Sequence, residues 1–242
     1  MLIIVLGASS KIGRSLAISF SSGNELILVG RDYGRLFECA GCCKDAGAKT
    51  VETVAFDMLN GVGPLVSCIG ARYVDLLVDS ASAASAKKDL EVGESEIVDL
   101  ITVDVSSRRT LLTAIKNNQS AGPAVILIST VLTLVHSPGR EIYSSIKRLS
   151  ECYYRNLSRA RPTVHYLVVH VGKVISRERE SRNAGNLAST VASAFGRREK
   201  VLIYGTSGRL FVLLYNLQPI LFRTVVYTRR IVAQMIRVRG IP

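Results

Sequence analysis

Two residues of the segment REIYSSIKRL, Tyr143 and Lys147, carry side chains that could move a proton. They are four residues apart, so on a helix they share one face. A phenol, with a pKa near ~10, is a weak acid–base catalyst at neutral pH, and a nearby ammonium lowers that pKa by stabilising the phenolate. The pair is therefore either a proton donor with the cation that tunes it or two neighbours on an ordinary helix.

A second candidate site lies near the start, where an apolar run leads into the loop between Gly7 and Gly13. Glycines in such a loop let backbone N–H groups approach a phosphate at the positive end of the following helix. The usual dinucleotide motif has a further glycine between these two, and Lys11 takes its place. The loop predicts a dinucleotide phosphate site, with an ordinary strand-to-helix turn as the alternative.

The residues after the second apolar run, Gly30, Arg31 and Asp32, indicate the type of dinucleotide. An NAD-preferring fold places a carboxylate near this point for the ribose hydroxyls, and Gly30 stands there instead. The Arg31 guanidinium can fork onto a 2′-phosphate, which favours NADP(H). Asp32 could pair with Arg31 or contact the ribose, and a solvated turn is the alternative. Asp57 is placed either to meet the adenine amino group or to cap a helix.

These residues must be positioned by strands and helices, which alternate along almost the whole chain. The apolar runs that predict strands are Leu2–Leu6, Glu25–Val29, Val51–Phe56, Leu76–Asp79, Ala124–Ser129, His165–His170 and Val201–Tyr204. The predicted helices are Ile12–Ser22, Tyr33–Ala46, Gly61–Gly70, Glu94–Asn117, Glu141–Ala160 and Ala188–Gly196. Buried strands alternating with helices predict an α/β fold: a doubly wound, Rossmann-like parallel sheet of about seven strands in three layers.

Composition fits one globular domain, with 242 residues, 48% hydrophobic content and a net charge of +12. The charge would suit an anionic partner, but nucleic acid is not expected because binding motifs and interleaved aromatics are lacking. The start lacks the basic leader of a signal peptide, and the apolar run 210–222 is shorter than the ~18–20 residues of a membrane-spanning helix. We expect a cytoplasmic protein.

Cysteines and histidines do not predict a metal site. The CxxC formed by Cys39 and Cys42 lies inside a predicted helix, whereas a redox motif opens one, so structural thiols are favoured. His136, His165 and His170 have no metal-ligand spacing among them. His136 lies between Thr130 and Tyr143, where it could border a substrate.

The chain resembles the short-chain dehydrogenase/reductase family across nearly its whole length. The landmarks, in family order and spacing, are Gly7 with Gly13, Gly30-Arg31, Phe56-Asp57, Ile128-Ser129-Thr130, Tyr143 with Lys147, and Gly172. The resemblance implies that the tyrosine exchanges a proton with the substrate oxygen while hydride passes to or from the nicotinamide. It implies that the lysine contacts the nicotinamide ribose and lowers the tyrosine pKa. The cofactor contacts expected from it are Gly7, Ser9, Ser10, Lys11, Ile12, Gly13, Arg31, Asp57, Met58, Ser80, Tyr143, Lys147, Gly172 and Val174.

Several positions depart from the family pattern. Thr130 stands for the substrate-binding serine and keeps its hydroxyl, and Asp104 stands for the asparagine of a proton relay, where it could order a water. Val171 replaces the proline before Gly172, and the turn after the fourth strand reads Asp79-Ser80-Ala81-Ser82 in place of asparagine-alanine-glycine. The departures fit a divergent active enzyme or a nucleotide-binding sensor or partner subunit that has lost catalysis.

Residues 209–242 form an apolar, basic C-terminal extension of the domain at 1–208. No Asp or Glu follows Glu199, while arginines recur through the apolar sequence. This mixture is typical of an interfacial element at an anionic membrane, here through 209–239, or of a subunit interface, and core packing is the alternative. The segment is also similar to the end of a reductase subgroup that acts on polyprenyl-linked sugars. Arg177, Arg179 and Arg182 lie where the family has a substrate-covering loop, with a solvated helix as the alternative.

We therefore expect an NADP(H)-preferring oxidoreductase that interconverts a ketone and a secondary alcohol. The expected catalytic residues are Thr130, Tyr143, Lys147 and Asp104. The expected partners are a small carbonyl or alcohol substrate and further copies of the chain, in a dimer or tetramer. The alternatives are NAD as the cofactor, a non-catalytic nucleotide sensor, and a peripheral reductase of a lipid-linked keto-sugar at the inner face of a membrane.

Overall fold

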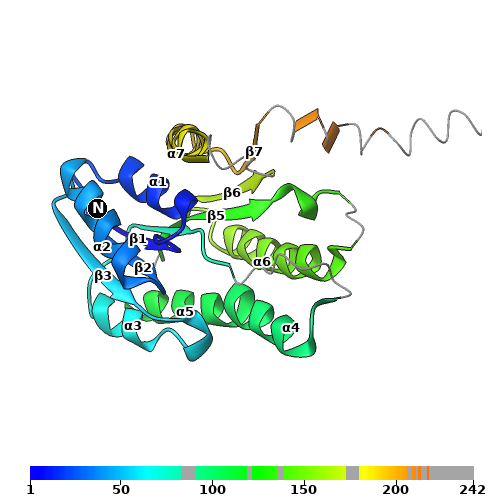
Figure 1. The fold of residues 1–242 in the computed structure, drawn as a ribbon, viewed down its shortest axis with the longest axis horizontal. Coiled ribbons are helices and arrows are strands. Elements are labelled where there is room, and N and C mark those ends of the chain that lie inside the picture. Colours follow the sequence, from blue (N-terminus) through cyan, green and yellow to red (C-terminus); the bar gives the residue numbers. More distant parts are fainter. Residues whose placement is uncertain are drawn as a thin grey trace, which may run out of the picture.

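Parallel strands form the centre of the molecule (Figure 1). The computed structural model describes residues 1–82, 91–118, 122–135, 139–172, 180–205, 209–210, 212–213 and 217. Within these residues, seven strands make one sheet in the order β3-β2-β1-β4-β5-β6-β7, and every neighbouring pair is parallel. The strands are β1 (Leu2–Leu6), β2 (Glu25–Gly30), β3 (Thr50–Ala55), β4 (Leu76–Asp79), β5 (Ala124–Thr130), β6 (Tyr166–Val171) and β7 (Val201–Tyr204). The predicted doubly wound sheet is confirmed.

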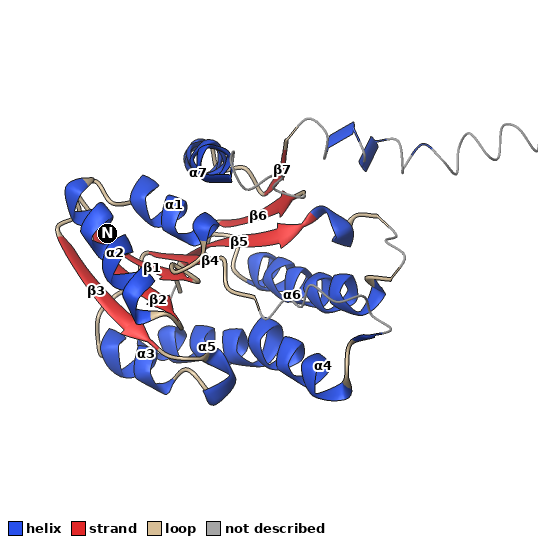
Figure 2. Ribbon diagram, in the orientation of Figure 1, coloured by secondary structure: helices blue, strands red, loops and turns tan. Residues whose placement is uncertain are grey.

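Helices cover both faces of the sheet (Figure 2). On one face lie α1 (Lys11–Ser19), α2 (Tyr33–Asp45) and α7 (Glu180–Gly196). On the other lie α3 (Gly63–Ile69), α4 (Glu94–Ile101), α5 (Arg108–Asn118) and α6 (Glu141–Ala160). The central strand β1 is therefore apolar throughout: each of its five residues is buried, and their side chains alternate between the two cores.

Three predicted helices differ from the structure by more than two residues at an end or by an interruption. The stretch predicted as one helix from Glu94 is divided by a π-helical turn, η3 (Thr102–Ser107), between α4 and α5. Helix α7 begins at Glu180, ahead of the predicted Ala188, because its polar first turns gave no apolar signal. Helix α1 ends at Ser19, not Ser22, since the chain turns into β2 through Gly23 with φ of +71°. Of the arginine-rich stretch, Arg182 lies within α7, which supports the helix alternative. Residues 177 and 179 lie outside the described part.

The sheet reverses its winding between β1 and β4, which lie side by side. The chain moves from β1 outward to β2 and β3, then returns to β4 on the other side of β1. Leu6 pairs with Val29 of β2 and with Asp79 of β4. In an open parallel sheet this switch point opens a crevice at the carboxyl ends of the strands, where ligands bind.

The beginning of the C-terminal extension packs onto the domain. Val212 is buried against Val131 and Val135, and the Arg209 guanidinium donates to the backbone oxygen of Ile203 at 2.9 Å. Most of 209–242, including the segment predicted to meet a membrane or a second subunit, lies outside the described residues. Among the helices that the structure describes, none has the length and apolarity needed to cross a membrane. Cys39 and Cys42 lie inside α2 as predicted, and both are free thiols.

Candidate active site at the carboxyl ends of the strands

The loop from β1 to α1 is compact because two glycines let backbone segments touch. Gly7 has φ of +76°, and a Cβ there would lie 2.9 Å from backbone atoms of Ser80 and Ala81. A Cβ on Gly13 would lie 2.1 Å from the backbone oxygen of Gly7, so no other residue fits. The hydroxyl of Ser10 caps α1 by accepting from the Gly13 N–H at 3.0 Å. The backbone of this loop therefore lies at the positive, N-terminal end of α1.

A cavity of about 560 Å³ opens in front of this loop. It collects the carboxyl ends of β1, β2, β3 and β4, which are the strands flanking the switch point. The residues of the predicted nucleotide set that line it are Gly7, Ser9, Ser10, Lys11, Ile12, Arg31, Asp57, Met58 and Ser80. Gly13 is packed against Gly7 and the Ser80 hydroxyl. One surface thus brings together residues from four separate loops.

Two arginines lie at the end of the cavity formed by β2 and β3. Arg31 pairs with Asp57, with 3.5 Å between Nη1 and Oδ2, and Arg35 pairs with Asp32, with 3.3 Å between Nε and Oδ2. Both guanidiniums line the cavity and are largely exposed, at 70% and 69% of their side chains. Two cations of this geometry can bind a phosphate through paired N–H donors.

The two aspartates that pair with or neighbour these arginines, Asp32 and Asp57, also cap the helices that follow them. Asp32 caps α2 by accepting from the Arg35 N–H at 3.0 Å. Asp57 caps the short 3₁₀ helix η1 (Met58–Asn60) by accepting from the Leu59 N–H at 3.0 Å. Of the alternatives for Asp32, the structure therefore has it paired with Arg35 rather than Arg31. For Asp57, the capping role is present in a residue that also lines the cavity.

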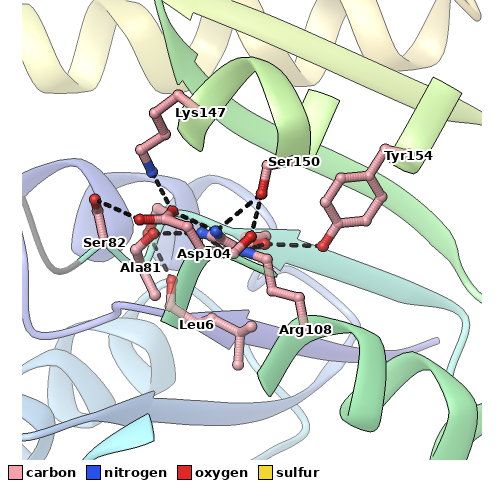
Figure 3. A network of polar contacts seen from close by, with 10 residues as sticks. Leu6, Ala81, Ser82, Asp104, Arg108, Lys147, Ser150 and Tyr154 are labelled. Atoms are coloured by element: carbon pink, nitrogen blue, oxygen red, sulfur yellow. Dashed lines mark hydrogen bonds and ion pairs between the residues drawn. The ribbon is translucent and has the colours of Figure 1, made fainter. Parts of the chain in front are cut away.

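Tyr143 and Lys147 lie one turn apart near the start of α6. The Lys147 ammonium is 6.0 Å from the centroid of the Tyr143 ring, so the two side chains lie on the same helix face. Lys147 is buried, and its Nζ lies 2.5 Å from Oδ1 of Asp104 (Figure 3). Burial lowers the pKa of Lys147, which Asp104 counters. The predicted pair is therefore a buried cation beside a phenol.

Asp104 comes from the π-helical turn η3 and is buried. Its Oδ1 accepts from Lys147 and from Arg108, and its Oδ2 accepts from the Ser82 hydroxyl at 3.4 Å. Burial alone would raise the pKa of the Asp104 carboxyl, but Arg108 and Lys147 lower it below its ordinary value. The expectation for this position was a relay through an ordered water, whereas the carboxylate contacts the lysine directly. Such π turns occur often at functional sites.

The Tyr143 phenol connects this buried group to the cavity. Burial raises its pKa, and the Asp104 carboxylate raises it further. The nearby Ser82 hydroxyl and the charges of Arg140 and Arg108 act in the opposite direction and lower the pKa. Ser82 itself lines the cavity, so the phenol lies near the cavity wall.

Thr130 ends β5, and its hydroxyl oxygen accepts from the Leu132 N–H at 3.3 Å. This bond uses an acceptor site of the oxygen and leaves the hydroxyl proton for a donor role. The neighbouring Ser129 is buried and donates to Glu151 of α6, which also accepts from Thr133 at 2.7 Å. His170 of β6 lies 3.4 Å from the same Glu151 oxygen. His170 therefore belongs to a buried polar cluster behind Thr130.

The remaining predicted positions lie at the end of β6. Gly172 directly follows β6, where an added Cβ would meet only Val131, at 4.0 Å. Val174 and His136 lie outside the described residues.

Sequence reasoning missed four contributors. Arg35 carried a signal, because it lies one helical turn after Arg31, and Arg108 lies one turn after Asp104. Ser82 and Ala81 were noted only as departures from a motif, and both line the cavity.

The chain is similar in sequence to known proteins. A family model described as short chain dehydrogenase matches residues 1–184. An uncharacterized oxidoreductase of Staphylococcus saprophyticus is 32% identical over 158 residues, which are 60% of this chain and 64% of that protein. The match therefore spans somewhat less than two thirds of that relative's length.

Solved structures share the fold. A short-chain dehydrogenase from Streptomyces avermitilis superposes with a TM-score of 0.77 at 19% identity, covering 96% of this chain and 99% of that one. A short-chain dehydrogenase from Sphingobium yanoikuyae, solved in complex with NADPH, gives 0.72 at 22% identity and covers 91% and 94%.

Proposed function

Because the chain belongs to the short chain dehydrogenase family, a family of oxidoreductases, we propose that it interconverts a ketone and a secondary alcohol with NADP(H). One observation carries the proposal: a phenol and a buried ammonium share one face of α6, and Ser82, which lowers the pKa of the phenol, lines the cavity in front of the glycine loop. A group that can transfer a proton would thus lie beside the bound nucleotide. Both are needed for hydride and proton to reach a carbonyl carbon and oxygen.

The residues of the cavity fit a dinucleotide. The loop from Gly7 to Gly13 leaves no room for a side chain at either glycine, and it lines the cavity at the N-terminus of α1. Ser9, Ser10, Lys11 and Ile12 would hold the pyrophosphate there, with Asp57, Met58 and Ser80 around the adenosine. When bound, the nicotinamide supplies or accepts the hydride.

The roles of the chain's own residues follow from their chemistry. Tyr143 gives a proton to the oxygen of a ketone, or removes one from an alcohol. Lys147 favours the phenolate by its charge and holds the nicotinamide ribose. Gly172 and Val174 remain predicted cofactor contacts. Thr130 donates its hydroxyl proton to the substrate oxygen. Asp104 keeps the lysine charged and in place.

The preference for NADP(H) rests on Arg31 and Arg35. Both line the cavity where β2 ends, and the position of an NAD-selective carboxylate is taken by Gly30. A Cβ on Gly30 would lie 2.5 Å from the Ser9 hydroxyl, so a longer residue there would require the Ser9 side chain to move. The NADPH complex of the Sphingobium yanoikuyae protein supports the same choice.

We further propose that the chain assembles as a homo-oligomer. Val98 and Ile101 of α4 and Leu149 of α6 expose 55%, 41% and 53% of their surface, and they would supply apolar area for a second copy. Sedimentation of the unmodified protein and of Leu149→Lys tests this, and a monomer in both cases contradicts it.

The test of the activity is oxidation of NADPH with a panel of ketones, followed by its absorbance. Tyr143→Phe keeps the ring and removes the phenolic proton, so it should bind NADPH normally and lose turnover by ~100- to 10,000-fold. Equal turnover by Tyr143→Phe contradicts the role of the phenol. Tight NADPH binding without turnover of any ketone by the unmodified protein would instead identify a nucleotide sensor.

A further inference from the structure

Arg108, at the first residue of α5, is the largest fully buried side chain among the described residues, with 1% of its surface exposed. Its guanidinium forks onto Asp79, with Nη2 3.0 Å from Oδ1 and Nε bonded to Oδ2. Nη1 donates to Asp104 and, at 3.3 Å, to Ser150, while Nη2 also donates to the backbone oxygen of Ala81 at 2.6 Å. Every nitrogen of the guanidinium therefore donates a hydrogen bond. The partners come from β4, the loop after it, η3 and α6 (Figure 3).

Each of these partners touches a different part of the proposed site. Ala81 belongs to the loop after β4 that lines the cavity. Ser150 lies on α6 one turn after Lys147 and donates to the backbone oxygen of Asp104. Asp79 ends β4 and accepts from the Tyr154 hydroxyl of α6 at 2.9 Å. One side chain thus connects the cavity loop, the π-helical turn and the helix that carries the proton-transfer pair.

The same oxygen of Asp104 accepts from both cations. Oδ1 bonds to Arg108 Nη1 and to Lys147 Nζ, so the direction of the Asp104 carboxylate toward the lysine is fixed by the arginine. The four charged groups, Asp79, Arg108, Asp104 and Lys147, sum to zero, which allows them to be buried together. An arginine that only filled the core would need Asp79 alone.

We propose that Arg108 is a positioning residue for the reaction: it aims Asp104 at Lys147 and ties the cavity loop to the catalytic helix, so that the ammonium keeps one place beside Tyr143. The expected effect on turnover rests on the proposed function. The positioning of Asp104 and Lys147 rests on the hydrogen-bond network alone. Arg108 does not itself touch the reacting groups.

The charge of Arg108 also acts on the Tyr143 phenol. The charged groups that face Tyr143 among the described residues are Asp104 of η3, Arg108 of α5, Arg140 before α6, and Lys147 of α6. Burial and Asp104 raise the pKa of Tyr143, and Arg108 is one of the groups that lower it. Loss of the arginine charge should therefore move ionisation of the phenol to higher pH.

Two charge-balanced variants separate position from charge. Arg108→Lys keeps a cation but loses the fork that reaches Asp79, Asp104, Ser150 and Ala81 at once. The double variant Asp79→Asn/Arg108→Gln removes one charge of each sign and leaves the Asp104–Lys147 pair neutral. The matched control is Arg72→Lys, in the exposed pair that Arg72 forms with Glu52 away from the cavity.

Two measurements are made on the full chain. The turnover number for ketone reduction should fall by about a hundredfold in both Arg108 variants, the loss expected when a catalytic group is misplaced, and should not change in Arg72→Lys. Tyrosine ring ¹³C NMR, with the Tyr143 signal assigned from Tyr143→Phe, follows ionisation without needing turnover. The double variant should titrate at higher pH than the unmodified protein, and Arg108→Lys should titrate close to it.

Folded Arg108 variants with unchanged turnover and an unchanged Tyr143 titration would overturn the inference. If the unmodified protein reduces no ketone, the proposed function fails, while the NMR titration still decides the inference. If neither charge variant folds, Ser150→Ala removes only one hydroxyl of the network and should lower the turnover number several-fold, and an unchanged value there overturns the inference as well.

Discussion

The ammonium of Lys147 lies 2.5 Å from Oδ1 of Asp104, and both side chains are buried. In water an ion pair of this kind adds little to stability, but here each charge has lost its hydration and depends on the other. The lysine that should tune Tyr143 is therefore held in place by a carboxylate of the chain itself.

Asparagine in place of this carboxylate should move the acid–base chemistry to lower pH. Asp104 raises the pKa of Tyr143, so Asp104→Asn should lower it, and the phenolate should form at lower pH than in the unmodified protein. In the direction of alcohol oxidation, which needs the phenolate, kcat/KM should therefore begin to rise at lower pH. The check is a pH profile of both proteins.

The same substitution leaves a buried surplus of positive charge, so it should also destabilise the fold by about 3–5 kcal/mol. Chemical denaturation measures this, and profiles are compared only where the variant is folded. A kcat/KM profile that moves to higher pH would contradict the inference that Asp104 raises the pKa of Tyr143.

Cofactor preference should depend on two arginines rather than one. Arg31→Ala should weaken NADPH binding ~10- to 100-fold and leave NADH binding nearly unchanged, because a charge-assisted phosphate contact is worth about 1.5–3 kcal/mol. Arg35→Ala should lower the preference further when combined with it. Fluorescence titrations with both nucleotides test this, with Arg72→Ala as the exposed control. Tighter binding of NADH than NADPH by the unmodified protein contradicts the proposal.

The hydroxyl of Thr130, not its methyl group, should matter for turnover. Thr130→Ser keeps the donor and should react at nearly the unmodified rate. Thr130→Val keeps the shape and loses the donor, so the turnover number should fall, while NADPH affinity stays constant. Equal rates for the serine and valine variants would show that the hydroxyl does not bind the substrate oxygen.

Two glycine-to-alanine changes in helices should have opposite effects on stability. Gly13→Ala places a methyl group 2.1 Å from the Gly7 backbone oxygen, so it should destabilise the fold by ~1–3 kcal/mol and abolish nucleotide binding. Gly185→Ala in α7 meets nothing within 4 Å and should stabilise by ~0.5–1 kcal/mol, with binding unchanged. Thermal unfolding with and without NADPH separates the two. Normal NADPH binding by Gly13→Ala contradicts the phosphate loop.

The inner strands could be predicted from the sequence because they are short, mainly apolar runs buried on both sides, and their alternation with helices determines a parallel sheet. The edge strands β3 and β7 are only partly buried. The cavity residues could be placed because parallel strands bring their carboxyl ends to one edge. The buried charge network could not. Asp104 and Lys147 are 43 residues apart, and Asp79 and Arg108 are 29 apart, so nothing local signals that they meet.

The π-helical turn was missed for a different reason. Apolar periodicity is continuous from Glu94 into α5, and one extra residue in a helical turn changes it too little to be seen. Only the structure shows that Thr102–Ser107 form a π-helical turn between the two α-helices.

Burial divides the charged groups of the site into two classes that dissolved salt treats differently. Arg31 and Arg35 expose about 70% of their side chains, so counter-ions at ~1 M salt, where screening extends only ~3 Å, weaken their pull on a phosphate. Asp79, Arg108, Asp104 and Lys147 are out of reach of those ions. Ionic strength should therefore raise the KM for NADPH while leaving kcat at saturating cofactor nearly constant, and the protein's cofactor discrimination, not its chemistry, would follow the salinity around it.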